Sequence, residues 1–174
     1  MDTMQAIRER KSTRSFSGEQ VGPDVLDQIL EAASCAPVAM GAYDSLHLTV
    51  VQDAGLLKRI AEGASAMASR MLGRARSMDF GAPTMVVVSS KPATMPGHEN
   101  LNVGCVAQSM AVAATGLGVD SLVWGAATAA ICADAGLAAE LGIPEGFAPV
   151  LAVSLGHAAS EEGPKSHKIA VNRV

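Results

Sequence analysis

Apolar residues recur along this chain with two periods, one typical of helices and one typical of buried strands. The clearest helix begins at Gly22-Pro23, because proline is favoured in the first helical turn, and it ends before Pro37. Short apolar runs predict strands at 46–51, 84–89, 119–124 and 148–155. The run 84–89 is apolar enough to be buried on both faces of a sheet. The other periodic stretches predict helices at 3–9, 56–76, 100–118 and 127–141. The stretches 56–76 and 127–141 could each hold one helix or two.

The stretch from Asn100 to Val119 carries no charge and approaches the length of a membrane span. Polar side chains and three glycines interrupt it, so we interpret it as a buried helix. Bulky residues follow one stripe of this helix and small residues another, which lets a second helix approach closely. The helix therefore belongs either to the core or to an interface between subunits. The small stripe consists of Gly104, Ala107, Ala111 and Ala114.

The order of the predicted elements favours an α+β fold. Strands are separated by helices, but without the regular β-α-β rhythm of a parallel sheet. We therefore expect a central mixed β-sheet surrounded by helices. The length of 174 residues suits one core, and the chain has no repeat or low-complexity linker, which predicts a single domain over residues 1–174.

Composition narrows the classes of function. Aromatic residues make up 3% of the chain and the formal net charge is −4, which argues against a nucleic-acid-binding protein. The three cysteines are far apart and form no Cys-x-x-Cys pair, so we expect buried small residues in a reducing compartment. No secretory signal pattern opens the chain, and we predict a cytoplasmic protein.

The positive charges gather at the two ends of the chain. Of the 13 lysines and arginines, four lie between Arg8 and Arg14, and none lies between Pro92 and Pro164. Guanidinium groups beside a small hydroxyl suit a phosphate monoester, because they bind its oxygens in pairs and the hydroxyl serves a remaining oxygen. The alternative, which the sequence leaves open, is that both charged ends are simply solvated. The tail contributes Lys165, Lys168 and Arg173.

No familiar catalytic motif accompanies these charges. Gly116-Leu117-Gly118 ends a helix and leads into a strand, whereas the dinucleotide fingerprint follows a strand and opens a helix. The sequence has no phosphate loop and no Gly-x-Ser-x-Gly elbow, and its four histidines lack the spacing of metal ligands. No metal site is predicted. If the protein is an enzyme, its reactive group is expected to come from a cofactor.

Five segments, in order along the chain, resemble the FMN-dependent nitroreductase family. The first is Arg10-Lys11-Ser12-Thr13-Arg14-x-Phe16, followed after a helix by Ala36-Pro37. The other four are Gly81-Ala82-Pro83, the small-residue helix running into Gly116-Leu117-Gly118-Val119, residues 141–147, and Leu155-Gly156. The ending at 167–174 also resembles shorter members, so the resemblance covers nearly the whole chain.

This resemblance implies an intertwined α+β homodimer that holds FMN at the subunit interface, with the small-residue helix packed there. The first segment would bind the phosphate end of FMN through Arg10, Lys11 and Ser12, with Arg14 nearer the flavin ring. Basic residues of the tail would complete the phosphate site. The tail candidates, in order of preference, are Arg173 and then Lys165 or Lys168.

Two further segments are implied to lie against the flavin. The loop after Ala36, contributed by the other subunit, lacks the serine and asparagine usual in the family, so backbone and apolar contacts are expected from Pro37, Val38, Ala39 and Gly41. The second segment would place its backbone against the ring, with the Gly125 amide donating to flavin N5; it consists of Leu122, Val123, Trp124 and Gly125. Trp124 could equally be a simple core aromatic.

The implied reaction is the NADH- or NADPH-dependent reduction of nitroaromatics, quinones or similar acceptors. Flavin N5 would be the reactive atom, with Arg14 and Gly125 tuning it and no catalytic side chain assigned. Donor and acceptor would use the same ring face in turn, which predicts ping-pong kinetics. Three alternatives stay open. The altered loop at Val38 and Gly41 would suit an FMN-binding protein with little turnover, and the family also contains members with another flavin reaction, such as dehalogenation or dehydrogenation. The third alternative is an acidic scaffold with no cofactor.

Overall fold

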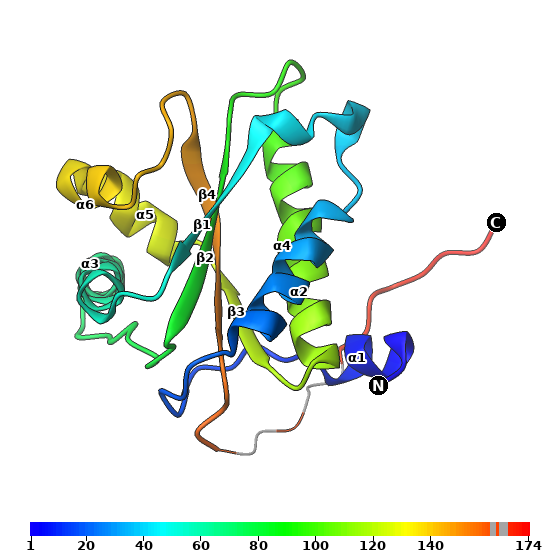
Figure 1. The fold of residues 1–174 in the computed structure, drawn as a ribbon, viewed down its shortest axis with the longest axis horizontal. Coiled ribbons are helices and arrows are strands. Elements are labelled where there is room, and N and C mark those ends of the chain that lie inside the picture. The colour runs from blue at the N-terminus through cyan, green and yellow to red at the C-terminus, as the bar shows by residue number, and fades with distance from the viewer. Residues whose placement is uncertain (161–162, 164–166) are drawn as a thin grey trace.

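Four strands form one sheet in the order β1-β2-β4-β3 within the residues that the computed structural model describes, 1–160, 163 and 167–174 (Figure 1). All three pairings between these strands are antiparallel. Each strand lies within about one residue of the apolar run that predicted it, well inside the usual uncertainty of element boundaries. The strands are β1 (Leu46–Val51), β2 (Thr84–Ser90), β3 (Asp120–Trp124) and β4 (Ala148–Gly156).

The sheet is antiparallel and not mixed, which corrects the expectation from the sequence. β2 and β3 run in the same direction, because the helix between them carries the chain back along the sheet. β4 lies between these two strands and is antiparallel to both. The two strands with a common direction are therefore never hydrogen-bonded neighbours.

Helices cover both faces of this sheet (Figure 1). The helices of one face are α1 (Thr3–Glu9), α2 (Pro23–Ser34) and α4 (His98–Gly116). Among these, α1 packs against α4. The helices of the other face are α3 (Ala54–Leu72), α5 (Ala126–Ala133) and α6 (Ala135–Glu140). Two 3₁₀ turns lead from α2 into β1, at Ala39–Gly41 and Tyr43–Ser45. The predicted α+β class, a central sheet surrounded by helices, is confirmed.

The central strand β2 is buried along its whole length. All seven of its residues are buried, because a layer of helices lies on each side. Val86 and Val88 pack with residues of α2 and α4, whereas Met85 and Val87 pack with residues of α3, α5 and α6. The prediction of a strand buried on both faces is confirmed.

The small-residue helix α4 is a core helix of the chain itself. Ala107, Ala111 and Ala114 are at most 1% exposed, and Met110 of the bulky stripe is fully buried. Ala107, Met110 and Ala114 pack with α2 and with the sheet, whereas Gly104 is exposed. Within one chain, the small stripe thus serves the core, which is one of the two alternatives that the sequence left open.

Two of the three cysteines are exposed, contrary to expectation. Cys35 is the C-cap of α2, beyond the last buried residue of that helix, and Cys132 lies near the end of α5. Cys105 in α4 is half-buried. The expectation that a small, weakly polar cysteine side chain is buried was wrong for Cys35 and Cys132, because both lie at helix ends, beyond the buried part of each helix.

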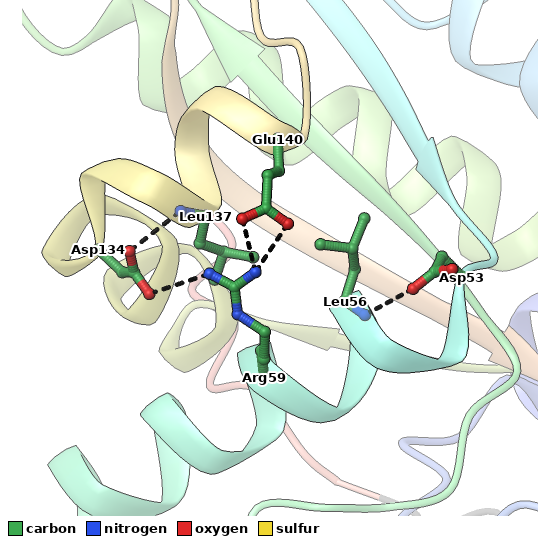
Figure 2. Close-up of polar contacts among 6 residues, drawn as sticks. All are labelled: Asp53, Leu56, Arg59, Asp134, Leu137 and Glu140. Carbon is green, nitrogen blue, oxygen red and sulfur yellow. Dashed lines mark hydrogen bonds and ion pairs between the residues drawn. The ribbon is translucent and has the colours of Figure 1, made fainter.

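An ion-pair group joins α3 to α6 on the outer face of the molecule (Figure 2). Arg59 Nη1 donates to both carboxylate oxygens of Glu140 at 2.7 Å, and Arg59 Nη2 lies 3.5 Å from Asp134 Oδ2. The other oxygen of Asp134 accepts the backbone N–H of Leu137 at 3.0 Å and so caps α6. The Leu137 N–H, and after it the Arg59 guanidinium, hold the pKa of Asp134 below its ordinary value.

Asp134→Asn tests this group, because asparagine also caps a helix but carries no charge. Since folding lowers the pKa of Asp134, its carboxylate stabilises the folded state above the unfolded pKa, and this stabilisation is lost as the pH falls through the folded pKa. We expect the original chain to unfold at a slightly higher temperature than the variant at neutral pH, and the two temperatures to converge below about pH 4. A difference that persisted at lower pH would show that the charge is not responsible.

Candidate functional site

The basic segment near the N-terminus lies along the open edge of the sheet. β3 is an edge strand, and Ser12 forms an isolated parallel bridge with Ser121 of that strand. The backbone N–H of Thr13 donates to the Ser121 carbonyl at 3.0 Å. Beyond the bridge, Phe16 pairs with Ala158, just after β4. The segment is therefore fastened to the fold by backbone contacts at two points.

Side chains at alternate positions of this segment have different surroundings. Lys11 Nζ lies 3.2 Å from Asp120 Oδ1, and the Thr13 hydroxyl donates to the same oxygen at 3.2 Å. Because alternate side chains of an extended segment point to opposite sides, Arg10, Ser12 and Arg14 occupy the positions that do not face Asp120. Two guanidinium groups and a hydroxyl thus share one side of the segment, which is a donor set for an anion with several oxygens.

Arg14 and Lys11 differ in what they contact. Arg14 is exposed, and its Nη1 donates to the carbonyl of Ser12 at 3.2 Å, so the guanidinium lies back over the segment. Lys11 is half-buried, with its ammonium group paired to Asp120. Within the described residues, Lys11 is the member of the cluster that forms an ion pair. Its expected contact with a phosphate would require this pair to be shared or broken.

Asp120 was not singled out by the sequence analysis. It is the first charged residue after the uncharged stretch 100–119, and it begins an edge strand. Its second oxygen, Oδ2, accepts the backbone N–H of Ala158 at 3.0 Å. A lone acidic residue at the end of a long uncharged stretch was the available signal, but its partners Lys11 and Ala158 lie far from it in the sequence.

The turn between β3 and α5 lies at the other end of the same edge strand. Leu122 is buried, whereas Val123 and Trp124 are half-buried. The Trp124 indole N–H donates to the Ser154 hydroxyl at 3.0 Å, and its ring meets Phe80 edge-on, with 5.4 Å between ring centroids. The Trp124 side chain is thus part of the packing on the α3 face, so only its backbone is available to a ligand at the turn.

Gly125 is the exposed N-cap of α5. Its backbone angles, φ −90° and ψ −16°, are open to any residue, and a Cβ built on it would meet no atom within 4 Å. Neither the backbone nor the packing of this chain therefore requires a glycine at this position. A glycine here leaves open space beside the amide at the start of a helix, which suits the close approach of a flat ligand.

The loop after α2 lies near the opposite end of α4. The Ala39 N–H donates to the side-chain oxygen of buried Asn102 at 2.9 Å, and the Tyr43 hydroxyl donates to the carbonyl of Ala36 at 2.9 Å. Met40 has a left-handed backbone with φ 59° and is 87% exposed. A methionine held in this strained conformation with its side chain in solvent is unusual. Pro37 and Gly41 are also exposed, and Val38 is half-buried.

One chain does not bring this loop and the basic segment together. The loop is anchored at Asn102, near the start of α4, whereas α1 and the basic segment lie by its last turn, where Gly116 approaches Ala6. At 1.5 Å per residue, the helix separates these two points by about 21 Å. The two predicted halves of the site therefore lie at opposite ends of α4 (Figure 1).

The two basic chain ends meet only in part. Ser17 N–H donates to the His157 carbonyl at 2.8 Å, and Ala159 N–H donates to the Ser15 carbonyl at 2.9 Å, so the start of the tail lies beside the N-terminal segment. The end of the chain, residues 167–174, runs away from the sheet (Figure 1). Lys168 and Arg173 on this stretch are exposed, and neither forms an ion pair or side-chain hydrogen bond with another described residue. Lys165 lies outside the described residues.

A separate cavity of about 420 Å³ lies between α3, the segment 78–83 and the sheet. Apolar side chains, among them the Trp124 ring, form most of its wall. The two amides on its lining are already engaged, because Gln52 donates to the Thr84 hydroxyl at 3.1 Å and that hydroxyl donates to Gln20. Two charged residues of the lining also have partners, because Lys58 lies 3.9 Å from Glu62 and Asp79 accepts the Gly81 N–H at 3.0 Å. The cavity therefore offers fewer free polar groups to a ligand than the edge of β3.

The described residues include neither a metal-binding group nor a membrane-spanning helix. Their histidines, cysteines and acidic residues form no group of three that could hold a metal ion. Their helices include none that is both long and apolar enough to cross a bilayer.

Comparison with known proteins gives consistent results. A sequence model described as the nitroreductase family matches residues 7–157. A protein of Methanothermobacter thermautotrophicus, named as a candidate NADH dehydrogenase/NAD(P)H nitroreductase, is 27% identical over 167 residues, which are 95% of this chain and 82% of that protein. A nitroreductase of Desulfitobacterium hafniense, solved with bound FMN, is 30% identical and superposes with a TM-score of 0.86 over 99% of this chain and 100% of its own. An FMN-bound nitroreductase of Bacteroides fragilis is 27% identical, with a TM-score of 0.80 over 99% and 100% of the two chains.

Proposed function

The chain belongs to the nitroreductase family, and from this premise we propose that it is an FMN-dependent oxidoreductase that uses NADH or NADPH to reduce nitroaromatics, quinones or similar acceptors. The observation that carries the proposal is the basic segment fastened to the edge of β3. Two guanidinium groups and a hydroxyl share one side of that segment, and the same strand ends at the open space beside Gly125. Further support comes from the two relatives solved with FMN.

The residues fit the phosphate end of FMN. Arg10 and Ser12 would bind the phosphate, since a dianion with three free oxygens takes both paired guanidinium donors and a hydroxyl. Lys168 and Arg173 of the tail, or Lys165, would complete the shell. The formal charge of the whole protein is −4, so the attraction for this anion has to be local.

The residues also fit the flavin ring. The backbone of Leu122 and Val123 and the amide of Gly125 would lie against it, because no side chain at Gly125 blocks the approach. Arg14 would reach the ring and stabilise negative charge on it, while the Gly125 N–H would orient it. Bound FMN would supply the redox chemistry, accepting electrons from NAD(P)H and passing them to the acceptor. Donor and acceptor would then occupy the same place in turn, which gives ping-pong kinetics.

The site is proposed to be completed by a second copy of the chain in a homodimer. Pro37, Val38, Ala39 and Gly41 lie too far from the basic segment to serve the same ligand within one chain. The loop would instead cover the flavin held by the partner, with the exposed Met40 as its most prominent side chain. A cytoplasmic location is part of the same proposal, since the widely spaced cysteines suit a reducing compartment.

The first test is cofactor loading and turnover. We expect the purified protein to be yellow, to release FMN on denaturation, and to oxidise NADH or NADPH rapidly when menadione or a nitroaromatic is present. A colourless protein that neither takes up FMN nor gains thermal stability from it would refute the proposal. Tight FMN binding without turnover would instead indicate a passive flavin-binding protein.

Arg10 and Arg14 are expected to differ in their effects. Arg10→Ala removes a phosphate contact and should weaken FMN binding by about tenfold or more, the usual cost of a hydrogen bond to a charged group. Arg14→Gln should slow flavin reduction by NAD(P)H more than it weakens binding, because its charge would lie near the ring. Fluorescence titration and stopped-flow reduction measure the two quantities. Equal losses of binding and reduction in the Arg14 variant would contradict this division.

The shared site can be tested by mixing two defective chains. Arg10→Ala damages the basic segment, and Asn102→Ala removes the side chain that holds the loop. If each site combines the segment of one chain with the loop of its partner, a mixed dimer regains one intact site. Random pairing should then restore about one quarter of the FMN sites. No recovery on mixing, with both parent variants folded by thermal unfolding, would place each site within one chain.

A further inference from the structure

Asp120 joins three separate parts of the chain. It is the first residue of β3, and its side chain is 23% exposed. Oδ1 forms an ion pair with the Lys11 ammonium group at 3.2 Å and accepts a hydrogen bond from the Thr13 hydroxyl at 3.2 Å. Oδ2 accepts a hydrogen bond from the Ala158 N–H at 3.0 Å. One carboxylate thus links the basic segment, the edge strand and the stretch that leads into the tail.

These contacts differ from an ordinary surface ion pair. A lysine and an aspartate that meet in solvent stabilise a protein very little. Here Thr13 is only 5% exposed, so its hydroxyl would lose its one described hydrogen-bond partner in a buried place if Asp120 were removed. The three contacts together restrict where the segment lies and which of its side chains face outward.

Asp120 is also an unfavourable charge for the proposed ligand. A carboxylate beside an anion-binding segment repels a phosphate, and its pairing with Lys11 cancels much of that repulsion. Electrostatics alone would therefore make the site bind FMN better if Asp120 were absent, because the repulsion would end and Lys11 would be released. A role in positioning predicts the opposite result.

We propose that Asp120 is a positioning residue for the phosphate end of the cofactor site. By holding Lys11 and Thr13 on one side of the segment, it presents Arg10 and Ser12 on the other. Lys11 then acts through Asp120 and does not contact the phosphate. This inference rests on the proposed function, and it assigns Asp120 no part in the redox chemistry.

The test compares FMN with riboflavin, which lacks the phosphate. We expect Asp120→Ala to weaken FMN binding by about tenfold or more, the cost of misplacing a charge-assisted hydrogen bond. Riboflavin binding should change far less, so the preference for FMN falls. Unchanged or tighter FMN binding would overturn the proposal. Equal losses for both flavins would also overturn it, because they would indicate a general structural defect.

Variants of Lys11 provide a second test of the same proposal. Lys11→Met should lower the preference for FMN in the same direction as Asp120→Ala, and the double variant should be no worse than Asp120→Ala alone. A further loss in the double variant would mean that Lys11 contacts the phosphate directly. Asp134→Ala is the matched control, since it removes a carboxylate paired with Arg59 on the other face of the sheet and should leave both affinities unchanged.

Folding and cofactor binding can be separated in the same experiment. If Asp120→Ala does not fold, Asp120→Asn and Thr13→Val replace it. Asparagine keeps the shape of the side chain and one acceptor oxygen, enough for either the Ala158 N–H or the Thr13 hydroxyl, while valine removes only the hydroxyl contact. Each should show a smaller loss of FMN preference, and a full preference in both would overturn the proposal. Failure of the original chain to bind FMN would refute the proposed function itself. Normal binding with no effect of the Asp120 variants would refute only the positioning role.

Discussion

The backbone hydrogen bond from Thr13 to Ser121, 3.0 Å long, is the contact on which the proposed site depends. It fastens the basic segment to the open edge of β3 and so decides which side chains face the protein. A shift of one residue along that edge would exchange the two sets of side chains, because alternate positions of an extended segment face opposite sides. Lys11 and Thr13 would then face the ligand, and Arg10 would be turned inward. Only in this register do Arg10, Ser12 and Arg14 face away from Asp120.

The register also bears on how the proposed phosphate site would work in an acidic protein. The net charge of −4 repels a phosphate at long range, but this repulsion is screened over about 10 Å at moderate salt. Inside that range the nearest charges decide, and Asp120 is neutralised by Lys11 at 3.2 Å. Among the described residues, Arg10 and Arg14 form no ion pair, so their charges remain for a ligand. The cluster therefore contributes two different kinds of cation, one that compensates a carboxylate and others that remain for a ligand.

The sequence predicted local elements better than the contacts between them. The burial of β2 and the position of α4 follow from apolar periodicity, which is a property of neighbouring residues. The antiparallel sheet does not follow from it, because the last strand of the chain inserts between β2 and β3. Asp120 was missed for a similar reason, since its contact with Thr13 joins residues 107 positions apart. Lys11 was grouped with the arginines because charge is visible in a sequence, whereas the partner of a charge is not.

The length of α4 determines how many chains a complete site needs. Within one chain, about 21 Å of this helix separates Asn102, which holds the loop at Ala39, from Gly116 beside α1, and the basic segment is fastened at that second end of the sheet. Because α4 is buried between α2 and the sheet, it cannot shorten or bend to close this gap without opening the core. A ligand that requires both the loop and the segment must therefore take them from two copies. The proposed flavin site therefore requires the proposed homodimer, because the core of one chain holds its two halves apart.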